Sequence, residues 1–136
     1  MRNIIFALLI SLTATSCFVA AEPVTVSYAA PTGWVTLGER TVHGRVDRDI
    51  IHVGRANGRF HRLQFMVENS SLEMFDVRVV MGDGTAFHAP TRYVFHPGQA
   101  SQVIDLPGGA RVVRRVEFRY GNLPGGGRAR VILMGS

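Results

Sequence analysis

The chain has 136 residues, of which 46% are hydrophobic and 18% are charged. This length suits one domain rather than two, and the apolar content excludes a disordered polymer. The 15 basic residues are all arginine, and with the 10 acidic residues they give a formal net charge of +5, which permits anionic partners.

The N-terminus has the pattern of an export signal. Arg2 supplies a short positive region, residues 4–12 are almost entirely apolar, and Ala21 ends a stretch of small residues. The apolar run is shorter than the roughly 20 residues that a membrane-spanning helix needs. We therefore predict a signal peptide over residues 1–21, a leader or linker over residues 22–32, and one domain over residues 33–136.

Cys17, the only cysteine, leaves a second route of export open. The residues before it, Ala14-Thr15-Ser16, loosely resemble a bacterial lipobox, although the usual leucine is missing and Phe18 is unlike a polar tether. We favour ordinary cleavage to a periplasmic or secreted protein, with a lipoprotein anchored through Cys17 as the alternative. After ordinary cleavage we expect no disulfide and no transmembrane segment.

The first predicted strand begins at Trp34, the only tryptophan, and ends at Leu37. We expect Trp34 to be a core anchor at one end of the domain. The stretch that follows is less regular and contains Asp47 and Asp49 on either side of Arg48. Two carboxylates are too few for a calcium loop, so an ion-pair cluster around Arg48 is favoured over a metal site.

Two further strands are predicted at residues 60–69 and 72–81, where apolar and polar residues alternate. A short polar turn separates them, so we interpret residues 60–81 as a hairpin. Residues 85–97 are interrupted by prolines, which favour an edge strand or a loop between sheets.

A second hairpin is predicted from the short apolar run at residues 102–106 and the alternating run at residues 111–120. The turn between them, Pro107-Gly108-Gly109, has the residues that tight turns need. A helix would also gather several apolar residues of the second run, but its valines and aromatic residues favour a strand.

Asp105 stands at the end of the first run of this hairpin. We expect it to accept backbone hydrogen bonds in the turn or to pair with Arg111 or Arg114, with a site carboxylate as the alternative. Structural roles are thus predicted for Trp34, Asp105, Gly108 and Gly109.

A last strand is predicted at residues 128–134. Several short strands, frequent turns and no helical periodicity predict an all-β fold, a small antiparallel β-sandwich of jelly-roll-like type.

The sequence contains no motif for a catalytic nucleophile, a phosphate cradle or a metal centre. We therefore predict no enzyme activity, no cofactor and no metal. Export argues against nucleic acid as a partner, in spite of the basic charge.

Several motifs of the chain occur together in a known pattern. They are Gly33-Trp34, Asp47-Arg48-Asp49, Gly58-Arg59-Phe60, Gly82-Asp83-Gly84, and above all Ile104-Asp105-Leu106-Pro107-Gly108-Gly109-Ala110-Arg111. This pattern resembles a family of small bacterial exported proteins known as domain of unknown function 2541, over roughly residues 33–134. The resemblance implies an exported β-rich domain and implies no activity.

The arginines favour a non-catalytic binding or structural module of the cell envelope. One face of the strand predicted at residues 111–120 presents the candidate binding residues Arg111, Arg115 and Arg119. Guanidinium groups suit the carboxylates and phosphates of envelope glycans or lipids. Two alternatives stay open: a solvated face with another envelope protein as partner, and a hydrolase of envelope material using Asp105, Asp76 or a histidine.

Overall fold

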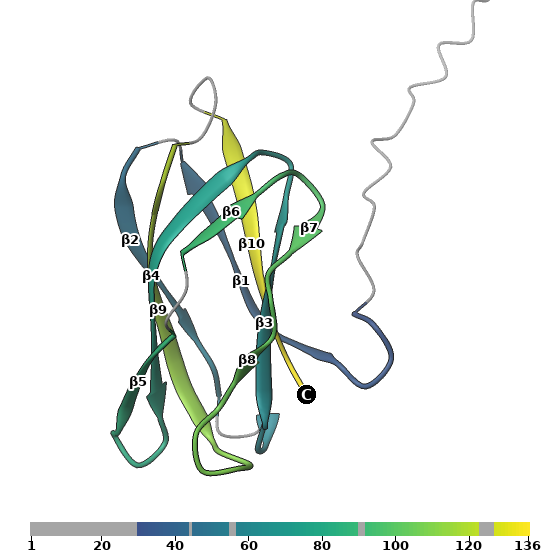
Figure 1. Cartoon of the computed structure of the whole chain (residues 1–136), viewed down its shortest axis with the longest axis vertical. Helices are drawn as coiled ribbons and strands as arrows, with labels where there is room; N and C mark the ends of the chain where they lie inside the picture. Colours follow the sequence, from purple (N-terminus) through teal and green to yellow (C-terminus); the bar gives the residue numbers. More distant parts are fainter. Residues whose placement is uncertain (1–29, 44, 55–56, 90–91, 123–126) are drawn as a thin grey trace, which may run out of the picture.

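The computed structural model describes residues 30–136, except residues 44, 55–56, 90–91 and 123–126. In this part of the chain, ten strands form two antiparallel sheets of five strands each, which pack face to face (Figure 1). The predicted all-β sandwich is confirmed. The predicted signal peptide, Cys17 and most of the predicted linker lie outside the described residues, among which no helix is long and apolar enough to cross a membrane.

The two sheets have the same plan. In sheet A the order is β1-β10-β3, and both β7 and β8 pair with the free edge of β3. Its strands are β1 (Val35–His43), β3 (Arg62–Glu68), β7 (Gln99–Ala100), β8 (Ile104–Asp105) and β10 (Arg128–Gly135). In sheet B the order is β2-β9-β4, and both β5 and β6 pair with β4. Its strands are β2 (Asp47–His52), β4 (Leu72–Met81), β5 (Ala86–Ala89), β6 (Tyr93–Phe95) and β9 (Val113–Gly121).

The pairing of the strands is nested. β1 pairs with β10, β2 with β9, β3 with β7 and β8, and β4 with β5 and β6. The chain therefore runs like one long hairpin rolled up into two sheets, in which β5 with β6, and β7 with β8, each act as one interrupted strand. This is the strand order of a jelly roll, so the jelly-roll-like prediction is confirmed.

Both predicted hairpins are wrong. β3 and β4 follow each other in the chain but lie in different sheets, and so do β8 and β9. β8 pairs with β3 instead of β9. Gly108 and Gly109, whose φ angles are 80° and 83°, form the turn that carries the chain from sheet A to sheet B. The proline and glycines of this turn thus correctly predicted that the chain changes direction, but not that the strands on either side of it lie in different sheets.

β1 extends far beyond the strand predicted at residues 34–37, and β2 lies in the less regular stretch where no strand was predicted. They are edge strands, and charged side chains join them at the side of the sandwich. Arg40 donates a hydrogen bond to the carbonyl of Ile50 (2.9 Å) and forms an ion pair with Asp49 (3.1 Å). The ion pair predicted between Asp49 and Arg48 is therefore formed with Arg40 instead.

The hydrophobic core lies between the sheets. Phe65 of β3 and Phe118 of β9 meet edge to face across it, with ring centroids 6.1 Å apart. The buried hydroxyl of Ser101 accepts the N–H of Phe65 (3.0 Å) and donates to the carbonyl of Gln102 (2.8 Å). This hydroxyl continues the hydrogen bonding along the edge of β3 where the chain passes from β7 to β8.

A second apolar cluster lies on the outer face of sheet A. Met66, Ile132 and Met134 alternate with core residues of β3 and β10, yet they are at most 4% exposed because the segment before β1 packs on them. Trp34 is half-buried on this cluster, and the guanidinium of Arg62 lies 5.4 Å from the centroid of its ring. Trp34 therefore anchors the chain to the outside of sheet A, whereas the sequence predicted a place in the core.

Candidate functional site

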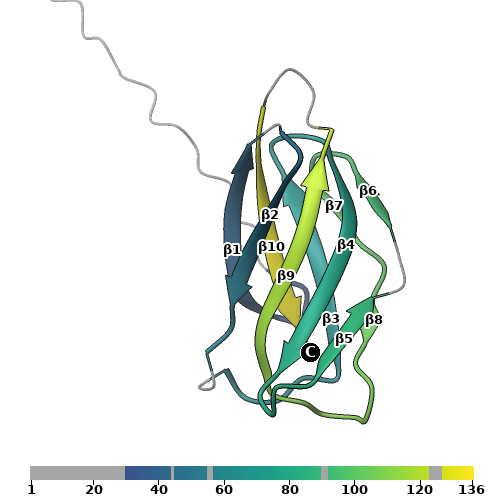
Figure 2. The same ribbon diagram turned by 90° about the vertical axis from the view of Figure 1, so that its left-hand side faces the viewer.

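The outer face of sheet B carries four arginines, Arg48, Arg78, Arg115 and Arg119, which we call the arginine face. The register of the strands brings them together, because residues directly opposite in an antiparallel pair share a face. Arg48 of β2 lies opposite Arg119 of β9, and Arg78 of β4 lies opposite Glu117 of β9. Figure 2 shows β2, β9 and β4 side by side, with β9 in the middle.

A bulge in β9 decides which arginines reach this face. The register between β4 and β9 shifts by one residue around Arg114. As a result Val113 is buried and Arg114 is exposed, so the regular alternation of residues 111–120 is interrupted at this point. Arg115 and Arg119 follow the bulge and lie on the outer face of the sheet.

Glu117 partly neutralises two members of the arginine face. Its carboxylate accepts hydrogen bonds from Nε of Arg115 (2.9 Å) and from Nη1 of Arg78 (3.0 Å). These two bonds, that of Arg115 first, hold the pKa of Glu117 below its ordinary value of 4.5.

Replacing Glu117 by glutamine is expected to destabilise the protein in a pH-dependent way. A carboxyl whose pKa is lowered by folding stabilises the folded state above its ordinary pKa, and this stabilisation is lost as pH falls through the folded-state pKa. At pH 7 the variant should lose about 1 kcal/mol of unfolding free energy, as for a good surface ion-pair network. Urea unfolding at several pH values should show this difference shrinking below pH 4.5. A difference that stays constant down to strongly acidic pH would contradict the ion-pair explanation.

Arg48 and Arg119 form the unneutralised part of the arginine face. Both are exposed, and among the described residues neither guanidinium has an acidic partner within ion-pair distance. Asp76, the neighbour of Arg119 on β4, approaches Nδ1 of His88 instead, at 3.6 Å. The carboxylate of Asp47 accepts the backbone N–H of Arg48 (2.7 Å). Two like charges therefore stand directly opposite each other.

Arg111 does not belong to the arginine face. It lies at the end of the sandwich, where its guanidinium donates to Asp83 (3.0 Å), to the hydroxyl of Thr85 (3.0 Å) and to the carbonyl of Pro107 (3.1 Å). Arg111 thereby ties the turn between β4 and β5 to the turn that precedes β9. The side chain of Asp105 is exposed and has no hydrogen bond or ion pair within the described part of the chain. The predicted pairing of Asp105 with an arginine is therefore not formed.

Arg128 and Arg130 do not extend the arginine face either, because β10 lies in sheet A. Arg130 forms ion pairs with Glu39 and, at 3.1 Å, with Glu68. The sequence missed Arg48 and Arg78 as members of the face, because their strands were not predicted to be neighbours of β9.

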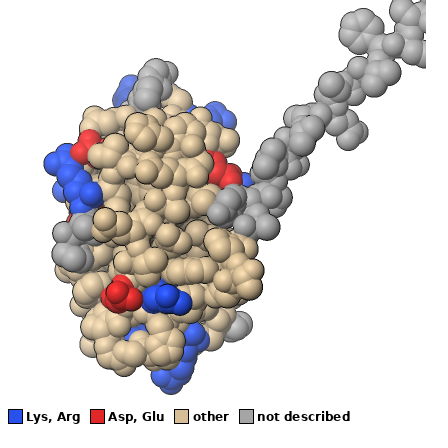
Figure 3. Space-filling view, turned by 45° about the vertical axis from the view of Figure 1, so that its right-hand side comes forward, with Lys and Arg blue, Asp and Glu red and all other residues tan. Residues whose placement is uncertain are grey.

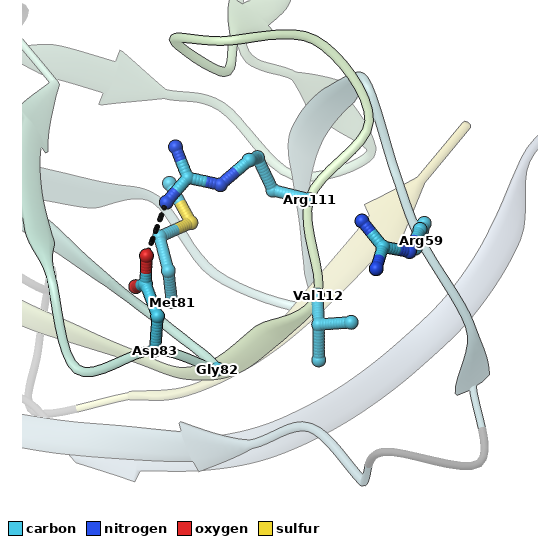
Figure 4. Close-up of a pocket in the computed structure, with 6 residues that line it drawn as sticks. All are labelled: Arg59, Met81, Gly82, Asp83, Arg111 and Val112. Atoms are coloured by element: carbon cyan, nitrogen blue, oxygen red, sulfur yellow. Dashed lines mark hydrogen bonds and ion pairs between the residues drawn. The ribbon is translucent and has the colours of Figure 1, made fainter.

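A recess of about 470 Å³ opens beside Arg111, and we call it the end recess. Its volume is about twice that of the recess at Arg48, Asp76 and Arg119, which measures about 220 Å³. The end recess is lined by Arg59, Met81, Gly82, Asp83, Arg111 and Val112 (Figure 4). The sequence did not predict it, since its residues come from three segments that only the fold brings together.

The described residues lack the groupings that metal binding and acid–base catalysis require. Where the structure describes the chain, no group of three or more His, Cys, Asp or Glu side chains could hold a metal ion. The side chains of His88 and Asp76 approach each other at the open surface, where they are 63% and 48% exposed. The hydrolase alternative requires such a pair in a deep pocket, which excludes water and shifts the pKa of the acid or base.

Comparison with known proteins places the chain in a family. The family model described as Domain of unknown function (DUF2541) matches residues 5–135. The chain belongs to this family. The resemblance indicated by the sequence motifs is therefore confirmed, over nearly the whole chain. No curated protein and no solved structure matches the chain.

Proposed function

We propose that the protein is an exported, non-catalytic binding module, whose arginine face docks onto carboxylate or phosphate groups of envelope glycans or lipids. The signal-like pattern of residues 1–21 supports export. The observation that carries the binding proposal is the pair Arg48 and Arg119, two exposed guanidinium groups opposite each other in register and without an acidic partner in the described residues.

The physical reason is that like charges directly opposite on two strands destabilise a sheet. An anion that lies between Arg48 and Arg119 removes this repulsion and accepts hydrogen bonds from both guanidinium forks. Arg78 and Arg115 lie on the same face and contribute longer-range attraction, although Glu117 offsets part of it. Glu117 and Asp76, which lie on the same face, offset only part of the four positive charges, so the face keeps a net positive charge.

The distribution of charge over the molecule favours one orientation towards an anionic surface. Residues 93–104, which include β6, β7 and the first residue of β8, contain no Asp, Glu, Lys or Arg. Figure 3 shows a side of the molecule on which charged side chains are few. An anionic surface would therefore attract the arginine face more strongly than it attracts residues 93–104.

Removing Arg48 and Arg119 together is expected to weaken binding to anionic material at least about tenfold, because two charge-assisted contacts are lost. The measurement is co-sedimentation of the protein with vesicles of phosphatidylglycerol and phosphatidylcholine, and with fractionated cell envelope, over a salt series. Binding of the wild type should weaken as salt rises. The variant Glu117→Gln, which frees Arg78 and Arg115, should bind more tightly than the wild type.

The matched control removes two arginines away from this face, Arg45 and Arg128, which are also exposed. The control variant Arg45→Ala with Arg128→Ala has the same net charge as Arg48→Ala with Arg119→Ala, and it should bind nearly as well as the wild type. Equal losses in the two double variants would mean that only net charge matters. Salt-insensitive capture of a single protein partner would also reject the proposal.

A further inference from the structure

The end recess is built by backbone hydrogen bonds between distant segments. Phe60 and Arg111 form an isolated antiparallel bridge, with the N–H of each bonded to the carbonyl of the other at 2.9 Å. The N–H of Gly82 donates to the carbonyl of Val112 at 2.8 Å. Gly82 permits this approach, because a Cβ there would lie 2.9 Å from Cγ1 of Val112. The recess is therefore preformed, which lowers the entropic cost of binding a ligand.

The two arginines of the end recess differ in how many of their donors are free. Both terminal nitrogens of Arg111 are engaged, by Pro107, Asp83 and Thr85, so this guanidinium is fixed in place. Arg59 makes a single long hydrogen bond in the described part of the chain, to the carbonyl of Ala110 at 3.4 Å. A guanidinium has five N–H donors, so Arg59 keeps most of its donors available to a ligand.

Apart from the two arginines, the lining of the end recess consists of Met81, Gly82 and Val112 and of one acidic residue, Asp83. Figure 4 shows Arg111 reaching over Met81 to Asp83, with Val112 between the two arginines. Arg59 and Arg111 carry two positive charges and Asp83 carries one negative charge, so the lining is positive by one. This balance suits a monoanion better than a phosphate dianion, which Asp83 would repel. Met81 and Val112 offer apolar contact to the remainder of such a ligand.

We infer that the end recess is a second binding site, independent of the arginine face, for a small organic carboxylate. The carboxylate group accepts two parallel hydrogen bonds from Arg59, the geometry for which the guanidinium fork is best suited. The apolar part of the ligand lies over Val112 and Gly82, and the fixed guanidinium of Arg111 borders it on the other side. A volume of about 470 Å³ falls within the range of small-molecule sites.

The test uses benzoate as the probe, because it joins one carboxylate to one apolar ring. Titration of the ¹⁵N-labelled protein, followed by amide NMR spectra, should give saturable shifts at the amides of Gly82, Asp83 and Val112. Benzyl alcohol, which has the ring without the charge, should give none, and inorganic phosphate should bind more weakly than benzoate. The absence of shifts at millimolar benzoate, or equal binding of phosphate and benzoate, would overturn the inference.

Two variants test the role of Arg59. Arg59→Gln should bind benzoate at least about tenfold more weakly, and Arg59→Lys should recover only part of the loss, because it keeps the charge but not the fork. Arg128→Gln is the matched control and should bind like the wild type. The double variant Arg48→Ala with Arg119→Ala should also keep benzoate binding, which separates this site from the arginine face. Unchanged binding in Arg59→Gln would refute the assignment.

Discussion

Replacing Phe65 by alanine is expected to lower the unfolding free energy by about 3–5 kcal/mol, the usual cost of removing a buried aromatic side chain. Phe65 is fully buried and packs edge to face on Phe118 of the opposite sheet, so its loss leaves a cavity between the sheets. Domains of this size are stable by only about 5–15 kcal/mol. The variant should therefore unfold at a much lower urea concentration, measured by circular dichroism.

The matched control for this prediction is Phe75→Ala. Phe75 is only half-buried and lies next to the guanidinium of Arg92, 4.8 Å from the ring centroid. The same truncation should cost clearly less there, because less apolar surface is removed from contact. Equal losses at the two positions would contradict a core in which Phe65 is packed between the sheets.

The strands with one apolar face were predictable, because apolar and polar residues alternate along a strand that has one buried and one exposed face. The predicted strand at residues 72–81 coincides with β4, and the predicted strand at residues 128–134 differs from β10 by one residue. β1 and β2 were largely missed, because their charged side chains cover an edge of the sandwich and weaken the alternation. Strand prediction from this sequence therefore succeeded in the middle of the sheets and failed at an edge.

The neighbours of each strand were not predictable in the same way. Alternation says which face of a strand is buried, but it does not say which strand lies beside it. Short turns between strands favour hairpins locally, yet in a jelly roll most consecutive strands lie in opposite sheets. Here only β4 is followed by a strand of its own sheet with which it pairs. Pairing of β1 with β10 depends on contacts between the two ends of the domain, which no local pattern records.

Only the part of the arginine face that lies on one strand was predictable, because the sequence does not show which strands are neighbours. Arg115 and Arg119 share a strand, so their common face follows from period two. Their companion Arg48 comes from β2, and the cross-strand pair became visible only with the register. Arg111 was assigned to the same face by spacing alone, but it precedes the bulge at Arg114 and is held at the end recess. The single inserted residue at the bulge therefore separates Arg111 from Arg115 and Arg119, although the three arginines are evenly spaced in the sequence.

Replacing Trp34 by alanine is expected to cost about 2 kcal/mol, because a half-buried aromatic side chain is removed and apolar surface beneath it becomes exposed. The surface concerned is the outer cluster of Met66, Ile132 and Met134, which is not part of the core between the sheets. The loss should appear in urea unfolding followed by circular dichroism. Trp34→Phe keeps a ring on the cluster and should recover most of the stability. If the alanine variant were as stable as the wild type, the segment before β1 would contribute nothing to the fold, and Met66 and Met134 would tolerate exposure to water.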